Sequence, residues 1–162
     1  AYMVRRAEKE LKIEVGQFGR EHKKIIKDFI RRQDLSAAQI HIFKNVSTYM
    51  RRSTSAYLLE ARKSGRLVAF SIVDLGSARY AFYQFSFRSA KQMVPGASDL
   101  LFNEMVRLAQ SEGKQAINLG LGVSAGIRRF KEKWGGEAFL EHRSVIIQRQ
   151  PAADISKLSK KL

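Results

Sequence analysis

Hydrophobic residues recur at helical spacing along five stretches of the chain. This spacing predicts helices over residues 2–10, 20–33, 37–52, 99–113 and 124–134. In residues 20–33, for example, Ile25, Ile26 and Phe29 fall on one face, and lysine and arginine residues occupy the other. Such helices are expected to pack one apolar face against a core and to leave a basic face in solvent.

Other stretches carry the shorter period of β-strands. Strands are expected over residues 11–15, 56–62, 67–75, 80–87, 114–122 and 137–150, the last as one long strand or a strand pair. The second to fourth of these are joined only by the short turns "KSGR" and "GSAR", which predicts an antiparallel meander. The strand at 114–122 follows a helix, so it is a candidate for parallel pairing.

Turn and capping residues bound these elements. Ser36 and Ser124 precede helical stretches as expected N-caps, and Gly113 follows one as its C-terminal glycine. The element order is β-α-α-β-β-β-α-β-α-β. It predicts a protein of the α/β (α+β) class, with a mixed, mostly antiparallel sheet flanked by helices. Residues 1–150 are expected to form a single domain, and residues 151–162 a C-terminal tail.

Charge and composition narrow the partners. The 162 residues carry a net charge of +15, spread along the whole chain, which favours nucleic acid, anionic lipid or a phosphate-rich cofactor, although a plain basic surface is also compatible. There is no cysteine, and the three histidines form no close pair, so no metal site is expected. No apolar run is long enough for a transmembrane segment, and no signal-peptide pattern is present, which favours a cytoplasmic protein.

The stretch "RSAKQMVPGASD", residues 88–99, joins an aromatic strand to a helix. A helix N-terminus offers unpaired N–H groups and the positive end of a dipole, both suited to phosphate. The residues expected to bind a phosphate-bearing donor here are Arg88, Lys91, Gln92, Gly96, Ala97 and Ser98. The alternative is an ordinary helix entry, in which Asp99 caps the helix and competes with an anion.

The stretch "NLGLGVSAGIRRFKEKWGGE", residues 118–137, places a glycine-spaced turn between an apolar strand and a basic helix. Its candidate donor-binding residues are Asn118, Gly120, Gly122 and Arg128. Lys131 lies beside the apolar stripe of the helix, next to Phe130. The alternative is a sharp corner followed by a helix with a core face and a solvated face.

No nucleophile elbow, Walker A sequence or dinucleotide fingerprint occurs. Five residues on the expected strands could act as a base or orient a substrate: Glu60, Asp74, Tyr80, Tyr83 and Gln84. A structural role is the favoured interpretation of each, and Tyr83 and Gln84 are kept as weaker candidates for orienting a substrate.

The element order and the two strand-to-helix loops together resemble the GNAT superfamily of N-acyltransferases. The family pattern for the pyrophosphate loop separates Gln or Arg from the first Gly by two residues, whereas three residues separate Gln92 from Gly96 here. Three segments are similar in sequence to the Fem-type peptidyltransferases and to the catalytic domain of lysylphosphatidylglycerol synthases: "GASDLLFNEMVRLAQSEG", "NLGLG" and "RRFKEKWGG". The resemblance spans about residues 3–150.

The resemblance implies an N-acyltransferase that moves an acyl group from acyl-CoA, such as acetyl-CoA, to a small-molecule or peptide amine. The similarity to Fem-type enzymes implies aminoacyl-tRNA as the alternative donor. It also implies that Lys131, with Phe130 beside it, is the cation near the reacting carbonyl. A non-catalytic, GNAT-like polyanion-binding module is a second alternative. Because relatives usually have two such domains, the chain is expected to be one half of a longer protein or to form a homodimer.

Overall fold

The computed structural model describes residues 2–122 and 124–138 of the chain. The chain divides into two compact parts, residues 1–120 and 121–162. Each part is described by itself. The predicted single domain over residues 1–150 stays a prediction, and the expected strand at 137–150 and the tail lie outside the described residues, apart from residues 137 and 138.

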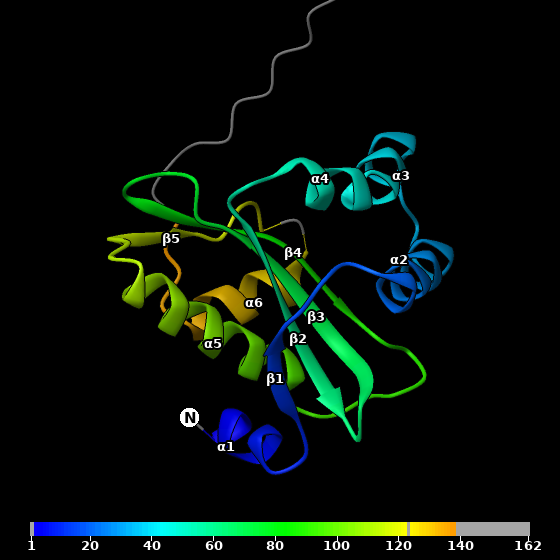
Figure 1. Ribbon diagram of the computed structural model, residues 1–162, viewed down its shortest axis with the longest axis horizontal. Coiled ribbons are helices and arrows are strands. Elements are labelled where there is room, and N and C mark those ends of the chain that lie inside the picture. The colour runs from blue at the N-terminus through cyan, green and yellow to red at the C-terminus, as the bar shows by residue number, and fades with distance from the viewer. Residues whose placement is uncertain (1, 123, 139–162) are drawn as a thin grey trace, which may run out of the picture. The chain divides into compact units, whose positions relative to one another are not determined.

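The first part contains five helices and five strands among its described residues. In chain order they are α1 (Tyr2–Glu8), β1 (Lys12–Val15), α2 (Arg20–Arg32), α3 (Ala37–Lys44), α4 (Val46–Arg52), β2 (Ala56–Lys63), β3 (Arg66–Asp74), β4 (Tyr80–Arg88), α5 (Ala97–Ser111) and β5 (Ala116–Asn118) (Figure 1). The described residues of the second part contain the helix α6 (Ala125–Lys133). No helix in the described stretches has both the length and the apolar character needed to cross a membrane.

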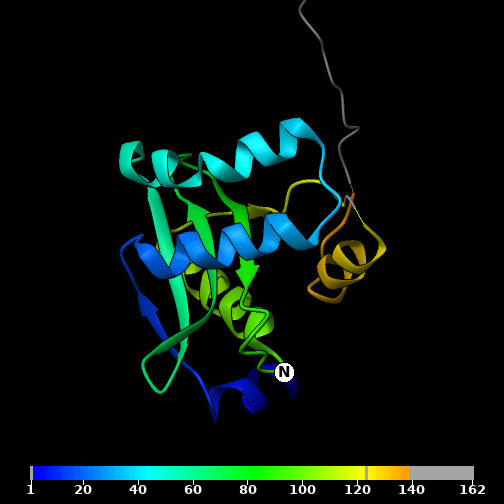
Figure 2. The same ribbon diagram turned by 90° about the vertical axis from the view of Figure 1, so that its right-hand side faces the viewer.

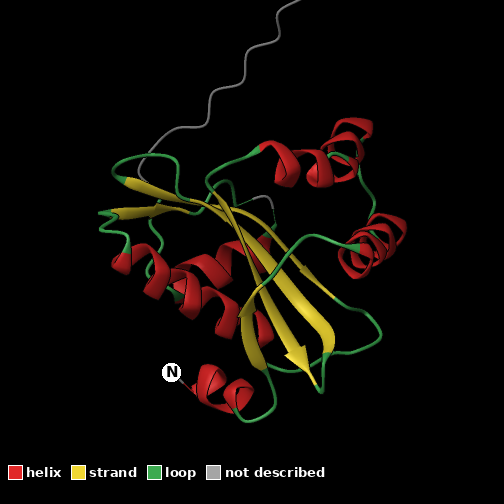
Figure 3. Cartoon of the chain, in the orientation of Figure 1, coloured by secondary structure: helices red, strands yellow, loops and turns green. Residues whose placement is uncertain are grey.

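The strands of the first part form one sheet in the order β1-β2-β3-β4-β5 (Figure 3). The pairs β1–β2, β2–β3 and β3–β4 are antiparallel, and β4–β5 is parallel. This confirms the mixed, mostly antiparallel sheet, the meander and the parallel strand that the sequence predicts. Helix α2 crosses one face of the sheet and α5 the other (Figure 2).

The main core lies between the sheet and the layer formed by α2, α3 and α4. It is built from the buried residues Ile25, Ile26, Val46, Leu58, Leu67, Phe70, Ile72 and Phe87. Phe29 and Phe43 from the helices meet the Phe87 ring edge-on, with ring centroids 5.3 Å and 5.7 Å away. The apolar face expected for α2 is therefore the face that covers the sheet.

Local capping follows the sequence closely. The Ser36 hydroxyl accepts a hydrogen bond from the Gln39 N–H at 3.3 Å, and the Gln39 side chain accepts one from the Ser36 N–H at 2.9 Å. Gly113 adopts the left-handed conformation (φ 66°) just after α5. Ser124 caps α6 through the Ile127 N–H. These three caps are confirmed.

Two elements differ from the prediction. The helix expected over residues 37–52 is two short helices, because Asn45 interrupts it with its side-chain amide donating to the His41 carbonyl at 2.9 Å. The strand expected over residues 114–122 is shorter, because the Asn118 side chain accepts the Gly120 N–H at 2.8 Å and Gly120 turns the chain at φ 65°.

Candidate active site

Strands β4 and β5 pair over only three residues and then separate. The parallel register joins Tyr80 to Ala116, Ala81 to Ile117 and Phe82 to Asn118. Beyond Phe82, no described strand pairs with the outer edge of β4, although β4 continues to Arg88. The two strands therefore form a pair that is closed at one end and open at the other.

The closed end is held by side chains at the start of β5. The Lys114 ammonium donates to the Leu75 and Ser77 carbonyls at 2.9 Å and 2.8 Å. The Arg79 guanidinium donates to the Gln115 side chain at 2.8 Å. These contacts fix β5 to the turn between β3 and β4, so the separation of the strands begins at a defined point.

A β-bulge in β4 lies next to this separation. Ile72 pairs with Phe85 and Val73 with Tyr83, which leaves Gln84 as the extra residue. Phe85 contacts Phe43 and Tyr49 on one face of the sheet, at centroid distances of 6.3 Å. A regular strand would turn Tyr83 to that same face, but the bulge carries Tyr83 to the face of α5.

On the α5 face, the Tyr83 ring meets the Phe102 ring edge-on at 5.5 Å. Burial raises the pKa of the Tyr83 hydroxyl, against the opposing effect of the neighbouring Ser86 and Ser71 hydroxyls. Ser71 and Ser86 also hydrogen-bond to each other at 3.1 Å. Tyr83 therefore stays protonated and can act as a hydrogen-bond donor near the bulge.

The loop from β4 to α5 begins with a serine turn that the sequence analysis did not identify. The Ser89 N–H donates to the Val68 carbonyl at 2.7 Å, and the Ser89 hydroxyl accepts the N–H groups of Lys91 and Gln92, each at 3.3 Å. Arg88 and Lys91 are exposed, and Gln92 is half-buried. The loop thus presents two cations at the open end of the β4–β5 pair.

The N-terminus of α5 has no side-chain cap. Gly96 is its N-cap residue, in the left-handed conformation at φ 84°, and Ala97 N–H donates back to the Val94 carbonyl at 3.2 Å. Ser98 is half-buried, and Asp99 is buried in the first turn. The Asp99 side chain lies in this first turn, where it competes with an anion bound at this end of the helix.

The glycine at position 96 is required by a neighbour within the protein. A Cβ atom there would lie 2.3 Å from the Met3 carbonyl oxygen and 3.2 Å from the Ala7 Cβ, both in α1. Close approach of a ligand was the reason expected from the sequence. The contact in the structure is made by α1, which supports the loop from behind.

Asn118 was expected in a buried strand, and this expectation was wrong. The residue is exposed, and its side chain accepts the Gly120 N–H in a local turn. Nothing lies within 4 Å of a Cβ added at Gly120, whose glycine is needed for its positive φ. Asn118 is nevertheless the last β5 residue paired with β4, so it marks the point of separation.

Gly122, Arg128, Phe130 and Lys131 lie in the second part of the chain. The buried Lys131 ammonium donates to the Leu121 carbonyl at 2.7 Å, which ties α6 to the glycine-spaced segment. Burial lowers the pKa of Lys131. The Lys133 ammonium lies 5.8 Å from the Phe130 ring centroid, and Arg128 is exposed beside Gly122.

Glu60 belongs to a buried network under α2. Its Oε1 atom lies 3.0 Å from His22 Nε2, and its Oε2 atom accepts from Arg62 at 2.6 Å. His22 Nδ1 accepts the Gly19 N–H at 3.0 Å, so a neutral ring carries its proton on Nε2, facing Glu60. Burial lowers the pKa of His22, although Glu60 opposes the shift. Both side chains support the fold beneath the loop from β1 to α2.

Asp74 fastens α4 to the end of β3. Its carboxylate accepts hydrogen bonds from the Tyr49 hydroxyl, the Ser55 hydroxyl at 2.9 Å and the Gly76 N–H at 2.8 Å. Burial alone would raise the pKa of Asp74, but these hydrogen bonds outweigh it and the pKa is lowered. A carboxylate held by so many donors is a structural anchor, as its sequence position suggested.

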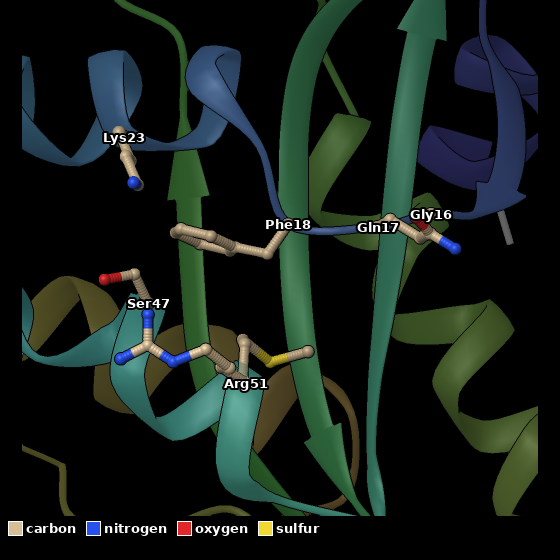
Figure 4. Close-up of a pocket in the computed structure, with 7 residues that line it drawn as sticks. Gly16, Gln17, Phe18, Lys23, Ser47 and Arg51 are labelled. Atoms are coloured by element: carbon tan, nitrogen blue, oxygen red, sulfur yellow. The ribbon is translucent and has the colours of Figure 1, made fainter.

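A cavity of about 440 Å³ opens on the other side of the sheet, between the loop before α2 and the helix α4 (Figure 4). We call this cavity the α2–α4 pocket. Its lining residues are Gly16, Gln17, Phe18, Lys23, Ser47, Met50 and Arg51. The sequence analysis missed it because no local motif marks three short segments that meet only in the fold. Across residues 2–122 and 124–138, no group of three acidic or histidine side chains could hold a metal ion.

Comparison with known proteins identifies the fold. No protein-family profile matches the sequence, and no curated protein is similar to it. Among solved structures, a possible acetyltransferase from Clostridium difficile 630 is similar with a TM-score of 0.64 and 12% identity, over 86% of this chain and 99% of that one. The ribosomal-protein-alanine N-acetyltransferase from Brucella melitensis biovar Abortus 2308 gives 0.60 and 16%, over 86% and 99%.

A third similar structure is the aminoglycoside N-acetyltransferase AAC(6')-Iy in complex with CoA. Its TM-score is 0.56 at 13% identity, over 86% of this chain and 94% of that one. Identities this low establish the fold and leave the activity to be argued from the site. The chain has the mixed α/β fold of the GNAT acetyltransferases.

Proposed function

We propose that the chain is an N-acyltransferase that moves an acyl group from acyl-CoA to an amine. The observation that carries the proposal is the β4–β5 pair, which opens beside the bulge at Gln84 and leads to the uncapped N-terminus of α5. An exposed strand edge can accept an extended, amide-containing chain such as pantetheine through backbone hydrogen bonds. A helix N-terminus with free donors suits a pyrophosphate.

The reaction needs little dedicated acid–base chemistry. The amine nitrogen attacks the thioester carbonyl carbon, a C–N bond forms, the C–S bond breaks, and the proton lost by the amine balances the thiolate. Negative charge develops on the carbonyl oxygen, so a fixed donor at the reacting carbon stabilises the transition state. We assign this donor to the backbone at the bulge, where Gln84 interrupts the regular ladder, with Tyr83 positioning the strand.

The phosphate end of the donor is assigned to the loop from β4 to α5. Arg88 and Lys91 supply exposed cations, Gln92 an amide, and the first turn of α5 the backbone donor of Ser98. Gly96 acts here through its fit against α1 and not by direct contact with the ligand. The three-residue spacing from Gln92 to Gly96 makes this loop one residue longer than the superfamily pattern.

The remaining candidates lie in the glycine-spaced segment and in α6, and the resemblance to Fem-type enzymes is what supports a role for Lys131 and Phe130. Lys131, with Phe130 beside it, is proposed as a second group at the reacting carbonyl in addition to the backbone at the bulge, and Arg128, Gly120 and Gly122 are proposed as donor contacts. Burial and the bond to the Leu121 carbonyl favour a positioned side chain over a solvated one, while the same burial lowers the pKa of Lys131 and so disfavours its charged form. Its present bond to the Leu121 carbonyl occupies one of its three donors.

Aminoacyl-tRNA is the second candidate donor, favoured by the net charge of +15 and by the Fem-like segment "RRFKEKWGG". Acyl-CoA is preferred because the single β4–β5 opening and the α5 N-terminus account for a CoA donor without a further domain. The proposed acceptor is a small-molecule or peptide amine.

The test is thermal unfolding with excess CoA or acetyl-CoA, beside a matched run with tRNA, at two salt concentrations. Ligand at 100 times its Kd stabilises by about 2.7 kcal/mol, which raises Tm by roughly 5–10 °C for a domain of this size. A salt-tolerant shift with CoA, reduced in Arg88→Gln and Lys91→Gln but not in Lys9→Gln, supports the proposal. A shift with tRNA alone that persists at high salt overturns it in favour of aminoacyl-tRNA, and one that vanishes there favours a polyanion-binding module.

A further inference from the structure

The α2–α4 pocket combines two cations with an apolar wall and is separate from the proposed donor site on β4 and β5. Lys23 extends from α2 on one side of the Phe18 ring, and Ser47 and Arg51 lie on the other side, on α4 (Figure 4). Lys23 and Arg51 form no ion pair with any residue in the described part of the chain, and none of the lining residues is acidic. This cavity therefore has unneutralised positive charge at its rim.

The wall of the pocket is a fixed aromatic ring. Phe18 stacks on His22 at a centroid distance of 5.2 Å and meets Phe70 edge-on at 6.4 Å. One ring face is thus covered by His22, and the other side of the ring lines the cavity together with the Met50 thioether. A planar apolar group can pack on such a surface without ordering a flexible side chain.

The segment that carries Phe18 is held rigidly. Gly16 lies against Glu60, whose carboxylate is fixed by His22 and Arg62, and the Gly19 N–H donates to His22. The pocket is therefore already formed before a ligand arrives, which lowers the entropy cost of binding.

The surrounding surface attracts polyanions. Residues 20–52 contain nine basic and three acidic residues, and two of the acidic ones are paired, Glu21 with Arg62 and Asp28 with Arg31. Arg20 and Lys27 continue the exposed row of Lys23 along α2, one turn to each side. This helix layer is the part of the described surface that best accounts for the large net charge.

We propose that the α2–α4 pocket binds a nucleotide unit, with the phosphate between Lys23 and Arg51 and the base against Phe18 and Met50. The Ser47 hydroxyl and the Gln17 amide supply neutral hydrogen bonds to the same unit. A phosphate at the edge of the Phe18 ring pairs with cations that line the cavity on both sides of that ring, and a base packs on the aromatic wall. The unit is either a free nucleotide or one residue of a single-stranded nucleic acid.

The test measures binding of a fluorescent single-stranded RNA octamer, with AMP and inorganic phosphate as competitors. Arg51→Gln, Lys23→Gln and Phe18→Leu are each expected to weaken binding about tenfold, since each removes a phosphate or a stacking contact. Lys9→Gln, which removes an exposed cation outside the pocket, is expected to change it less than twofold. Because Arg51 is exposed on α4, its variant is expected to fold even where the Phe18 variant does not.

The competitors separate the outcomes. If AMP displaces the RNA octamer at concentrations comparable to the RNA, the ligand is a free nucleotide. If RNA binds much more tightly than AMP and with a steep salt dependence, the ligand is a single strand. Both outcomes support the site. Equal losses in Lys9→Gln and Arg51→Gln overturn it, because the binding is then a general effect of charge. Displacement by inorganic phosphate as efficient as by AMP, with Phe18→Leu unaffected, also overturns it. The CoA-induced Tm shift is expected to be unchanged in Arg51→Gln, so failure here is distinguishable from failure of the acyltransferase proposal.

Discussion

Gly16 lies so close to the carboxylate of Glu60 that a Cβ atom at residue 16 would come within 1.9 Å of Glu60 Oε1. Glu60 cannot easily retreat, because His22 lies 3.0 Å from the same oxygen and Arg62 holds the other at 2.6 Å. The chain thus leaves β1 along a path that a carboxylate from β2 defines.

Gly16→Ala is therefore expected to destabilise the protein by about 1–3 kcal/mol, the usual cost of overpacking a buried site. Urea denaturation measures this loss. Gly19→Ala is the matched control, because the nearest atom to its Cβ is 3.9 Å away and its φ is negative, so only the poorer N-cap of α2 is expected to cost stability, by about 0.5–1 kcal/mol. Equal stability of the two variants would show that Glu60 moves freely.

Stability is expected to fall as the pH drops below about 6.5, because of His22. Burial lowers the pKa of its ring below the ordinary 6.5, so the unfolded chain takes up a proton in this window that the folded chain does not. The slope reaches at most about 1.4 kcal/mol per pH unit. Urea midpoints between pH 5 and 8 measure it, and His22→Gln is expected to remove it.

The carboxylates act in a separate, more acidic window. A hydrogen bond from Arg62 lowers the pKa of Glu21 below 4.5, so its contribution is lost only as the pH falls below that value. The separation of the two windows depends on the lowered pKa of His22. An NMR titration in which the His22 ring signals move with a midpoint at 6.5 or above would contradict that lowered pKa and the predicted fall in stability below pH 6.5.

Gly96→Ala is expected to be more damaging than Gly113→Ala. Both glycines have positive φ, 84° and 66°, so both variants carry the left-handed cost of about 1–2 kcal/mol. Only Gly96 also faces a backbone oxygen at 2.3 Å, from Met3, whereas nothing lies within 4 Å at Gly113. We expect a further loss of about 1–3 kcal/mol, read as the difference between the two thermal unfolding curves.

The Gly96 variant is also expected to bind the acyl donor less well, because displacement of α1 alters the loop that precedes α5. A Gly113→Ala protein with the same deficit would place the cause in general destabilisation.

Lys131→Met is expected to lower kcat about a hundredfold, the usual effect of losing one fixed donor to a developing oxyanion. The variant keeps the length and apolar stem of the side chain but loses the contact with the Leu121 carbonyl. Steady-state kinetics and the CoA-induced Tm shift are measured together, with Arg129→Gln as an exposed control on the same helix. A lost Tm shift with kcat preserved would make Lys131 a phosphate anchor.

The sequence predicts features that depend on near neighbours. The caps at Ser36 and Ser124 and the glycine at Gly113 follow from hydrogen bonds within four or five residues. The parallel strand that ends at Asn118 follows from the helix that precedes it. The fold class and the mixed, mostly antiparallel pairing of the sheet could be predicted because they follow from the order of such local elements.

Features that depend on distant pairing were not predicted. The bulge at Gln84 exists only in the register between β3 and β4, and it moves Tyr83 to a face that simple alternation would not give. The reason for glycine at position 16 lies 44 residues away, in Glu60. The α2–α4 pocket needs three segments to converge, and none of them carries a motif.

The pairing pattern of the sheet also orders its assembly in time. The hairpins β2–β3 and β3–β4 close short loops, which takes microseconds, whereas β5 reaches β4 only by way of the crossover helix α5. Strands β2, β3 and β4 can therefore pair before either β1 or β5 joins them, because β1 reaches β2 only by way of α2, α3 and α4. The opening between β4 and β5 therefore appears only after the meander has paired, so a chain stalled at that stage would contain the central strands and lack the proposed donor site.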